Sequence, residues 1–190
     1  MNLPNLLSLL RLCMVPIFVL SFFSKLEGSD YVALTVFVLA ALTDMLDGMI
    51  ARRQNKITTL GKVLDPLGDK LMALCVLTCL TIDGRIPLWA VIVLLVKEII
   101  MGIGGFYIYK KSAFMPPSNY FGKTSTVVLF IACVILIAFK DLPEPWPLVI
   151  ISIAIATTIV AFVNYLIVFI KLLRNIQKSG DTDPEDLESE

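Results

Sequence analysis

Long apolar stretches alternate with short polar segments along the whole chain. Each stretch holds about 20 mostly apolar residues, which is the length that a helix needs to cross the hydrocarbon core of a bilayer. The six stretches cover residues 5–24, 31–51, 65–83, 87–109, 121–140 and 146–172. The pattern therefore predicts an all-α, polytopic membrane protein with six transmembrane helices, and it assigns residues 1–176 to one membrane domain.

Basic residues are distributed unevenly among the segments that connect these stretches. The segments after the second, fourth and sixth stretches carry ten Lys and Arg, whereas those after the first, third and fifth carry three. Basic loops remain on the cytoplasmic side of a membrane. We therefore expect both termini and the segment 52–64 to be cytoplasmic.

Composition supports a membrane protein and narrows the chemistry. Hydrophobic residues make up 57% of the 190 residues and charged residues 17%, so a soluble enzyme and a disordered chain are both excluded. The net charge is zero, but six of the 16 acidic residues lie in the last ten positions, which predicts an acidic, disordered tail over 177–190. The chain has no histidine, which excludes a histidine base and histidine metal ligands.

Four carboxylates interrupt the second and third apolar stretches. Asp44 and Asp47 lie near the cytoplasmic end of the second, and Asp65 and Asp69 lie near the cytoplasmic start of the third. A carboxylate at membrane depth costs at least a few kcal/mol, so by default it indicates function. On helices each pair would share one face, and the two faces would offer four carboxylates to a common space.

Small residues continue these two faces. Gly48 and Ala51 follow on the first, and Gly61 precedes Asp65 by one turn on the second. Small side chains let a ligand or another helix approach the backbone closely. Asp65 is followed by Pro66, which favours a helix that starts here with Asp65 as its N-cap.

Four neighbouring anions require cations, and carboxylate oxygens are the ligands that Mg²⁺ and Mn²⁺ prefer. Two such ions about 3.5–4 Å apart promote phosphoryl-type transfer. Three carboxylates would hold the metals and the fourth would take a proton from an alcohol, while Arg52 and Lys62 would contact phosphate. Helix caps would explain one carboxylate pair but not both.

A divalent-cation transporter is the competing function of another class. Its carboxylates would lie near the bilayer midplane and often in repeated halves of the chain. Here they lie near one interface and occur in only two of the stretches. An enzyme whose substrate has a polar head and a lipid tail agrees better with that placement.

The spacing from Asp44 to Asp69 is D-x2-D-G-x2-A-R-x8-G-x3-D-x3-D. It resembles the signature of the CDP-alcohol phosphatidyltransferase family, and every signature position matches. The resemblance implies a six-helix membrane enzyme that is usually a homodimer. With the basic bias described above, we expect a protein of the bacterial plasma membrane whose active site faces the cytoplasm. The resemblance further implies transfer of a phosphatidyl group from CDP-diacylglycerol to an alcohol with release of CMP, among membrane lipids and without nucleic acid.

The resemblance also implies roles for individual residues. It makes Asp44, Asp47 and Asp65 ligands of two divalent cations, Mg²⁺ or Mn²⁺, and makes Asp69 the catalytic base, which also touches the second metal. The implied CDP-binding residues are Gly48, Ala51, Arg52, Thr58, Gly61 and Lys62.

The acceptor alcohol is indicated by other segments. The opening MNLPNLLSLLRLCMVPIF, with Arg11, and the stretch LDPLGDK resemble members that use glycerol 3-phosphate and form phosphatidylglycerophosphate. Those members usually carry Arg-Glu and a further Arg where this chain has Lys97-Glu98, and a second Lys where it has Ser125. The segment 116–126 also resembles cardiolipin synthases, whose acceptor is phosphatidylglycerol.

We expect glycerol 3-phosphate as the acceptor, with phosphatidylglycerol as the alternative. The expected acceptor-binding residues are Arg11, Lys97 and Lys123. Two of them have a structural interpretation as well. Lys97 would form an internal ion pair with Glu98, and Lys123 would extend to the membrane interface.

Overall fold

The structure is a computed structural model that describes residues 3–54, 61–112 and 120–180, with side chains for 9–43, 68, 70–105, 120 and 122–171. These residues form six helices and no strand. The helices are α1 (Leu3–Phe22), α2 (Ser29–Gln54), α3 (Gly61–Ile82), α4 (Leu88–Ser112), α5 (Tyr120–Ala138) and α6 (Trp146–Gly180). The all-α prediction is confirmed, and each apolar stretch forms one helix.

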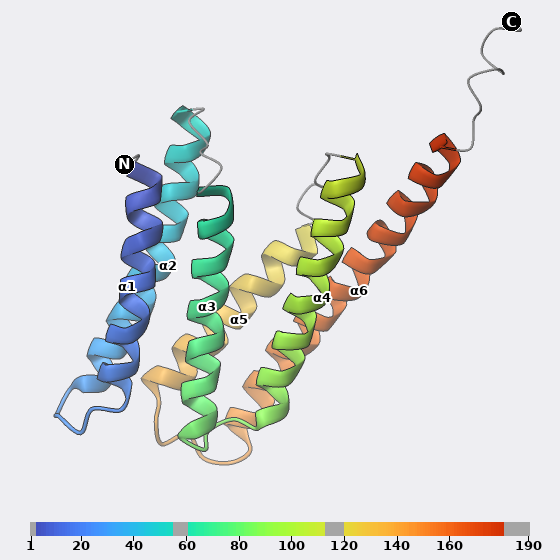
Figure 1. The fold of residues 1–190 in the computed structure, drawn as a ribbon. Coiled ribbons are helices and arrows are strands. Elements are labelled where there is room, and N and C mark those ends of the chain that lie inside the picture. The colour runs from blue at the N-terminus through green and yellow to red at the C-terminus, as the bar shows by residue number, and fades with distance from the viewer. Residues whose placement is uncertain (1–2, 55–60, 113–119, 181–190) are drawn as a thin grey trace, which may run out of the picture.

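The helices make two groups that meet at one end of the bundle (Figure 1). α1 packs against α2 and α3, and α4 packs against α6. α5 packs on α6 and also contacts α2 and α3, so it joins the two groups. The C-terminal end of α2, the start of α3, the start of α1 and the end of α6 all lie at the opposite end, where the groups diverge (Figure 1).

The apolar core draws on all six helices, and its aromatic part lies where α1, α2 and α5 face one another. Phe18, Phe37 and Phe130 form an aromatic chain through it, with ring centroids 6.3 Å apart for the first pair and 5.0 Å for the second. Val76 and Leu77 of α3 are fully buried beside it. Close packing of these large side chains, each of which makes many van der Waals contacts, holds this half of the bundle together.

α3 ends in a glycine turn at the end of the bundle where the groups meet. Gly84 has a φ of 79°, a conformation that other residues adopt at a steric cost. Its N–H donates to the carbonyl of Thr81 at 3.0 Å, and the N–H of Arg85 donates to the carbonyl of Leu80 at 3.0 Å. This is the Schellman arrangement, which satisfies two terminal carbonyls and turns the chain towards α4.

Arg85, in the α3–α4 turn, contacts residues of α1 and α5 and its own turn at this end of the bundle. Its Nη1 donates to the carbonyl of Leu136 at 2.7 Å, its Nε contacts Asp83 Oδ2 at 2.6 Å, and its guanidinium lies 5.4 Å from the ring centroid of Phe22. The Leu136 carbonyl is in the last turn of α5, where carbonyls lack an intrahelical donor. Arg85 therefore caps α5 from the α3–α4 turn.

Arg85→Ala should destabilise the bundle by about 2 kcal/mol, because the Leu136 carbonyl loses a charged donor in a partly buried site. Thermal unfolding in detergent measures the change, with Lys25→Ala in the exposed α1–α2 loop as the control. Equal melting temperatures for the two variants would contradict the capping role.

The outer surface of the bundle is strongly apolar. Leu20, Ile103 and Ile153 are 74%, 67% and 57% exposed, and other large apolar side chains are exposed on every helix. Two helical stretches, Leu88–Gly105 and Trp146–Lys171, are long and apolar enough to cross a bilayer. In the described part of α1, α2, α3 and α5 the apolar stretches are shorter, at 10–17 residues.

One local expectation is wrong. α3 begins at Gly61, so Asp65 lies inside the helix rather than at its N-cap. Pro66 therefore lies in the second turn. Its fixed φ suits a helix, but its missing N–H removes one backbone hydrogen bond, and a proline ring inside a helix crowds the carbonyl four residues earlier, a cost that the rest of α3 offsets.

Candidate active site

The four aspartates lie on two helices that are consecutive in the chain. Asp44 and Asp47 are in the C-terminal half of α2, and Asp65 and Asp69 are in the N-terminal half of α3. The helical spacing that places each pair on one face is confirmed. Their side chains lie outside the described residues, so their role as metal ligands remains a prediction.

The residues expected to bind CDP flank these aspartates. Gly48, Ala51 and Arg52 are on the last turns of α2, and Gly61 and Lys62 form the first turn of α3. Both sets are at the end of the bundle where the two helix groups diverge (Figure 1). Thr58 lies outside the described residues.

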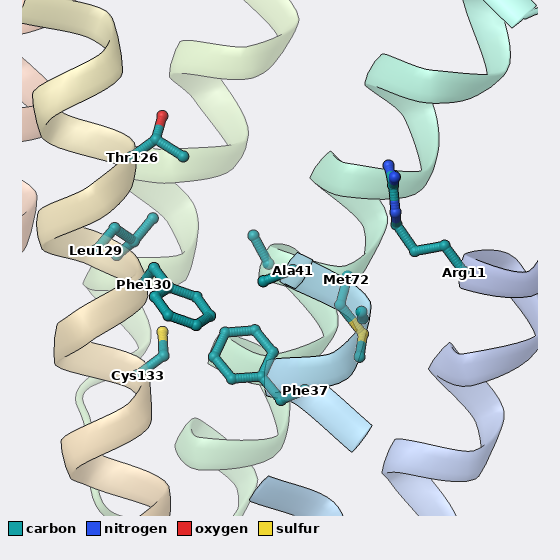
Figure 2. A pocket seen from close by; sticks show the side chains of 10 residues that line it. Arg11, Phe37, Ala41, Met72, Thr126, Leu129, Phe130 and Cys133 are labelled. Carbon is teal, nitrogen blue, oxygen red and sulfur yellow. The ribbon is translucent and has the colours of Figure 1, made fainter. Parts of the chain in front are cut away.

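A cavity of about 70 Å³ lies between α1, α2, α3 and α5 (Figure 2). Apolar side chains provide most of its wall, and Arg11 and Thr126 add polar groups. The other lining residues are Phe37, Ala40, Ala41, Met72, Ala73, Leu129, Phe130 and Cys133.

The cavity lies about one helical turn from Asp44 along α2 and from Asp69 along α3. Ala40 and Ala41 precede Asp44 by four and three residues, and Met72 and Ala73 follow Asp69 by three and four. Residues three or four apart share a helix face. The α2 face that carries Asp44 and the α3 face that carries Asp69 therefore both continue into the walls of one cavity, about one turn away.

Arg11 brings a positive charge to this interior. It projects from α1 towards α3 at the edge of the cavity (Figure 2), and only 1% of its surface is exposed. Arginine is almost never fully buried unless it is paired. Of the three residues expected to bind the acceptor, Arg11 is the one that lines the cavity.

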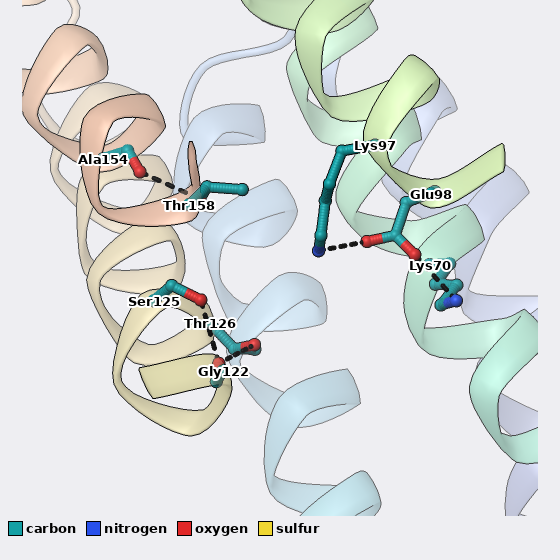
Figure 3. Close-up of polar contacts among 8 residues, drawn as sticks. All are labelled: Lys70, Lys97, Glu98, Gly122, Ser125, Thr126, Ala154 and Thr158. Atoms are coloured by element: carbon teal, nitrogen blue, oxygen red, sulfur yellow. Dashed lines mark hydrogen bonds and ion pairs between the residues drawn. The ribbon is translucent and has the colours of Figure 1, made fainter. Parts of the chain in front are cut away.

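Lys97 takes part in an ion-pair cluster between α3 and α4. Its Nζ lies 2.6 Å from Oε1 of Glu98, whose Oε2 lies 2.7 Å from Nζ of Lys70 (Figure 3). The internal ion pair expected of Lys97 and Glu98 is confirmed. The second partner, Lys70, was not foreseen from the sequence, because it is 28 residues away from Glu98 on another helix.

Lys123 is exposed in the first turn of α5. In the next turn Ser125 and Thr126 both donate to the carbonyl of Gly122, at 2.9 and 3.1 Å (Figure 3). Ser125 is 5% exposed, and it occupies the position where a second lysine was expected. The buried hydroxyl of Ser125 is therefore satisfied within its own helix.

A family model described as CDP-alcohol phosphatidyltransferase matches residues 1–170. The chain is 38% identical over 143 residues to a cardiolipin synthase (CMP-forming) of Streptomyces coelicolor, an alignment that covers 72% of this chain and 65% of the relative. It is 31% identical over 173 residues to a probable phosphatidylglycerophosphate synthase of Mycobacterium tuberculosis, covering 87% and 80%.

A further relative is from Aquifex aeolicus and is named CDP-diacylglycerol–glycerol-3-phosphate 3-phosphatidyltransferase. The two chains are 37% identical over 129 residues, which is 67% of this chain and 70% of the relative. The aspartates, the cavity and the ion-pair cluster described above all lie within the residues that the family model matches.

Proposed function

Because the chain belongs to the CDP-alcohol phosphatidyltransferase family, and is thus a transferase of phospholipid biosynthesis, we propose that its donor is CDP-diacylglycerol and its acceptor glycerol 3-phosphate. The acceptor hydroxyl attacks the β-phosphorus, the bond to the CMP oxygen breaks, and phosphatidylglycerophosphate and CMP are formed. Two relatives whose names state this activity support the proposal. A third is named as a cardiolipin synthase, so phosphatidylglycerol is the second candidate acceptor.

The observation that carries the proposal is the shared cavity beneath the aspartate faces. Its walls continue the α2 face of Asp44 and the α3 face of Asp69. The cavity is apolar except for Arg11 and Thr126. Carboxylates next to a mostly apolar cavity suit a substrate that has a charged head group and an apolar remainder.

The donor set fits two divalent cations. Asp44, Asp47, Asp65 and Asp69 provide only carboxylate oxygens, which Mg²⁺ and Mn²⁺ prefer. When bound, the ions would polarise the phosphate and stabilise the charge that develops on the leaving oxygen. Asp69 also accepts the proton of the attacking hydroxyl.

The remaining residues bind the nucleotide. Arg52 contacts phosphate oxygens through bidentate hydrogen bonds of its guanidinium group, and Lys62 contacts them as a point charge. Gly48, Ala51 and Gly61 leave the backbone accessible to the cytidine head, and Thr58 offers it a hydroxyl.

We assign the six helices to six membrane spans, with residues 1–176 as the membrane domain and 177–190 as an acidic tail, of which residues 177–180 are the helical end of α6 and not disordered. The exposed apolar side chains on every helix support immersion in lipid. The ten-to-three bias of basic residues places both termini and the aspartate end in the cytoplasm of a bacterial cell. A homodimer is the proposed assembly.

The acceptor is tested with purified full-length protein, labelled CDP-diacylglycerol, Mn²⁺, and either glycerol 3-phosphate or phosphatidylglycerol. Rapid CMP release with glycerol 3-phosphate, together with labelled phosphatidylglycerophosphate, is the expected result. CMP release with phosphatidylglycerol alone would show a cardiolipin synthase. Absence of CMP release with both acceptors would contradict the proposed reaction.

Lys123 provides a second test of the anionic acceptor. Lys123→Ala should raise the KM for glycerol 3-phosphate about tenfold, the loss expected for one charged contact, and change the KM for CDP-diacylglycerol less than about twofold. Thr124→Ala is the matched control, because Thr124 is the exposed neighbour and its hydroxyl donates to the Tyr120 carbonyl. Equal changes in both KM values would exclude a specific acceptor contact.

A further inference from the structure

One carboxylate on α4 holds two ammonium groups. Oε1 of Glu98 lies 2.6 Å from Nζ of Lys97, its neighbour on the same helix, and Oε2 lies 2.7 Å from Nζ of Lys70 on α3 (Figure 3). The first contact is local to α4. The second joins two helices, so it constrains how they sit against each other.

Lys70 directly follows Asp69 along α3. Successive residues on a helix point about 100° apart, so Lys70 meets α4 on a face beside the one that carries Asp69. A helix moves nearly as a rigid rod over two turns. Any rotation or sliding of α3 that separated Lys70 from Glu98 would therefore displace Asp69 and Asp65 by a similar amount.

α4 is itself held in place by α6. A Cβ atom at Gly104 would lie only 3.1 Å from Cε2 of Phe169, so the two helices approach closely at this glycine. Phe169 in turn stacks on Tyr165, with ring centroids 6.3 Å apart. α3 and α4 diverge towards the aspartate end of the bundle (Figure 1), and the Lys70–Glu98 pair links them on the way to that end.

We propose that Lys70 is a positioning residue, whose ion pair with Glu98 fixes the rotation and height of α3 and thereby sets Asp65 and Asp69 for divalent cations. This role rests on the metal-binding part of the proposed function. Lys70 acts through the helix and not by contact with the substrate.

A simple charge effect makes the opposite prediction for one variant. An ammonium group near a cation site repels cations, so removal of its charge alone would strengthen Mn²⁺ binding. If Lys70 positions α3, the same substitution weakens Mn²⁺ binding. The sign of the change in Lys70→Met therefore separates the two explanations.

The experiment measures Mn²⁺ binding to the full-length protein in detergent, from the electron paramagnetic resonance signal of free Mn²⁺. We expect Lys70→Met and Glu98→Gln each to raise the Kd about tenfold, the lower end of losses seen when supporting groups around metal ligands are removed. The double variant should be no weaker than either single one, because both break the same link. Lys70→Arg, which keeps the charge and the reach, should stay within about twofold of wild type.

Lys140→Met is the matched control. Lys140 pairs with Asp30 between the α5–α6 segment and α2, and the two side chains are 42% and 30% exposed, against 44% and 23% for Lys70 and Glu98. Its loss should lower the melting temperature as much as the loss of Lys70 and leave the Kd for Mn²⁺ unchanged. A weakened Kd in Lys140→Met would show a general loss of stability and overturn the positioning role.

Several outcomes oppose the proposal. An unchanged or lower Kd in Lys70→Met overturns it, as do additive losses in the double variant or a wild-type protein that binds no Mn²⁺. If Lys70→Met does not fold, Lys70→Gln, which removes the same positive charge with a polar side chain, decides the question by the same criterion. CMP release assayed in parallel separates the two claims: an inactive wild type with weakened Mn²⁺ binding in Lys70→Met contradicts only the proposed reaction.

Discussion

Asp44→Asn, Asp47→Asn and Asp65→Asn should each lower the rate of phosphatidyl transfer at least a hundredfold. Asparagine keeps the size of the side chain and one oxygen, but it removes the negative charge that holds a divalent cation. The cations supply much of the stabilisation of the transition state, and loss of one such electrostatic contribution typically costs about 10²–10³ in rate.

CMP release from CDP-diacylglycerol measures this loss, and the melting temperature in detergent shows whether each variant is folded. Asp141→Asn is the matched control, since Asp141 is an exposed aspartate in the connection between α5 and α6. A variant that kept more than about a tenth of the wild-type rate would lose less than about 1.4 kcal/mol of transition-state stabilisation, and its aspartate would not be a ligand.

Removal of divalent cations should abolish the reaction in the wild-type protein. Four carboxylates on two helices, in a chain without histidine, offer only the oxygen ligands that Mg²⁺ and Mn²⁺ prefer. Without them the phosphate would meet a cluster of anions and would be repelled. Exhaustive treatment with EDTA, followed by addition of Mg²⁺ or Mn²⁺, measures the effect through CMP release.

Recovery after addition of either ion shows that EDTA removed the cations and did not denature the protein. The melting temperature of the metal-free sample provides the same control before ions are restored. Full activity in the metal-free protein would contradict the two-cation mechanism, and it would also remove the reason for grouping the four aspartates.

The helices were predictable because apolar length is a strong and local signal. Each of the six expected stretches coincides with one helix of the structure, and the largest difference is at the end of α6, which runs to Gly180 where residue 172 was expected. The larger differences arise where polar residues continue a helix. α2 runs on to Gln54 through Arg52 and Arg53, and α3 starts at Gly61, because helices extend beyond their apolar part when water or loops satisfy the terminal turns.

The site was predictable only where it is local in sequence. The pattern from Asp44 to Asp69 can be recognised from the spacing of residues one helical turn apart, on each of two helices that are consecutive in the chain. The contacts of Lys70 with Glu98 and of Arg85 with the Leu136 carbonyl were not predictable, since the latter joins residues 51 positions apart. Such pairs depend on how helices pack, and a single sequence contains no direct record of that packing.

α6 is longer than a membrane is thick. Its apolar stretch Trp146–Lys171 has 26 residues, which corresponds to about 39 Å of helix, while the hydrocarbon core measures about 30 Å. A helix of this length tilts to match the bilayer, and α6 is inclined to α1–α3 in the bundle (Figure 1). In a thinner bilayer it would tilt further.

We expect a change in that tilt to displace α4, which packs on α6 where Gly104 meets Phe169. α4 carries Glu98, and Glu98 holds α3 through Lys70. Hydrophobic mismatch between α6 and its surroundings is thus linked mechanically to the helix that bears Asp65 and Asp69. On the proposed function and positioning role, we therefore expect the rate of phosphatidyl transfer to depend on the acyl-chain length of the surrounding lipids.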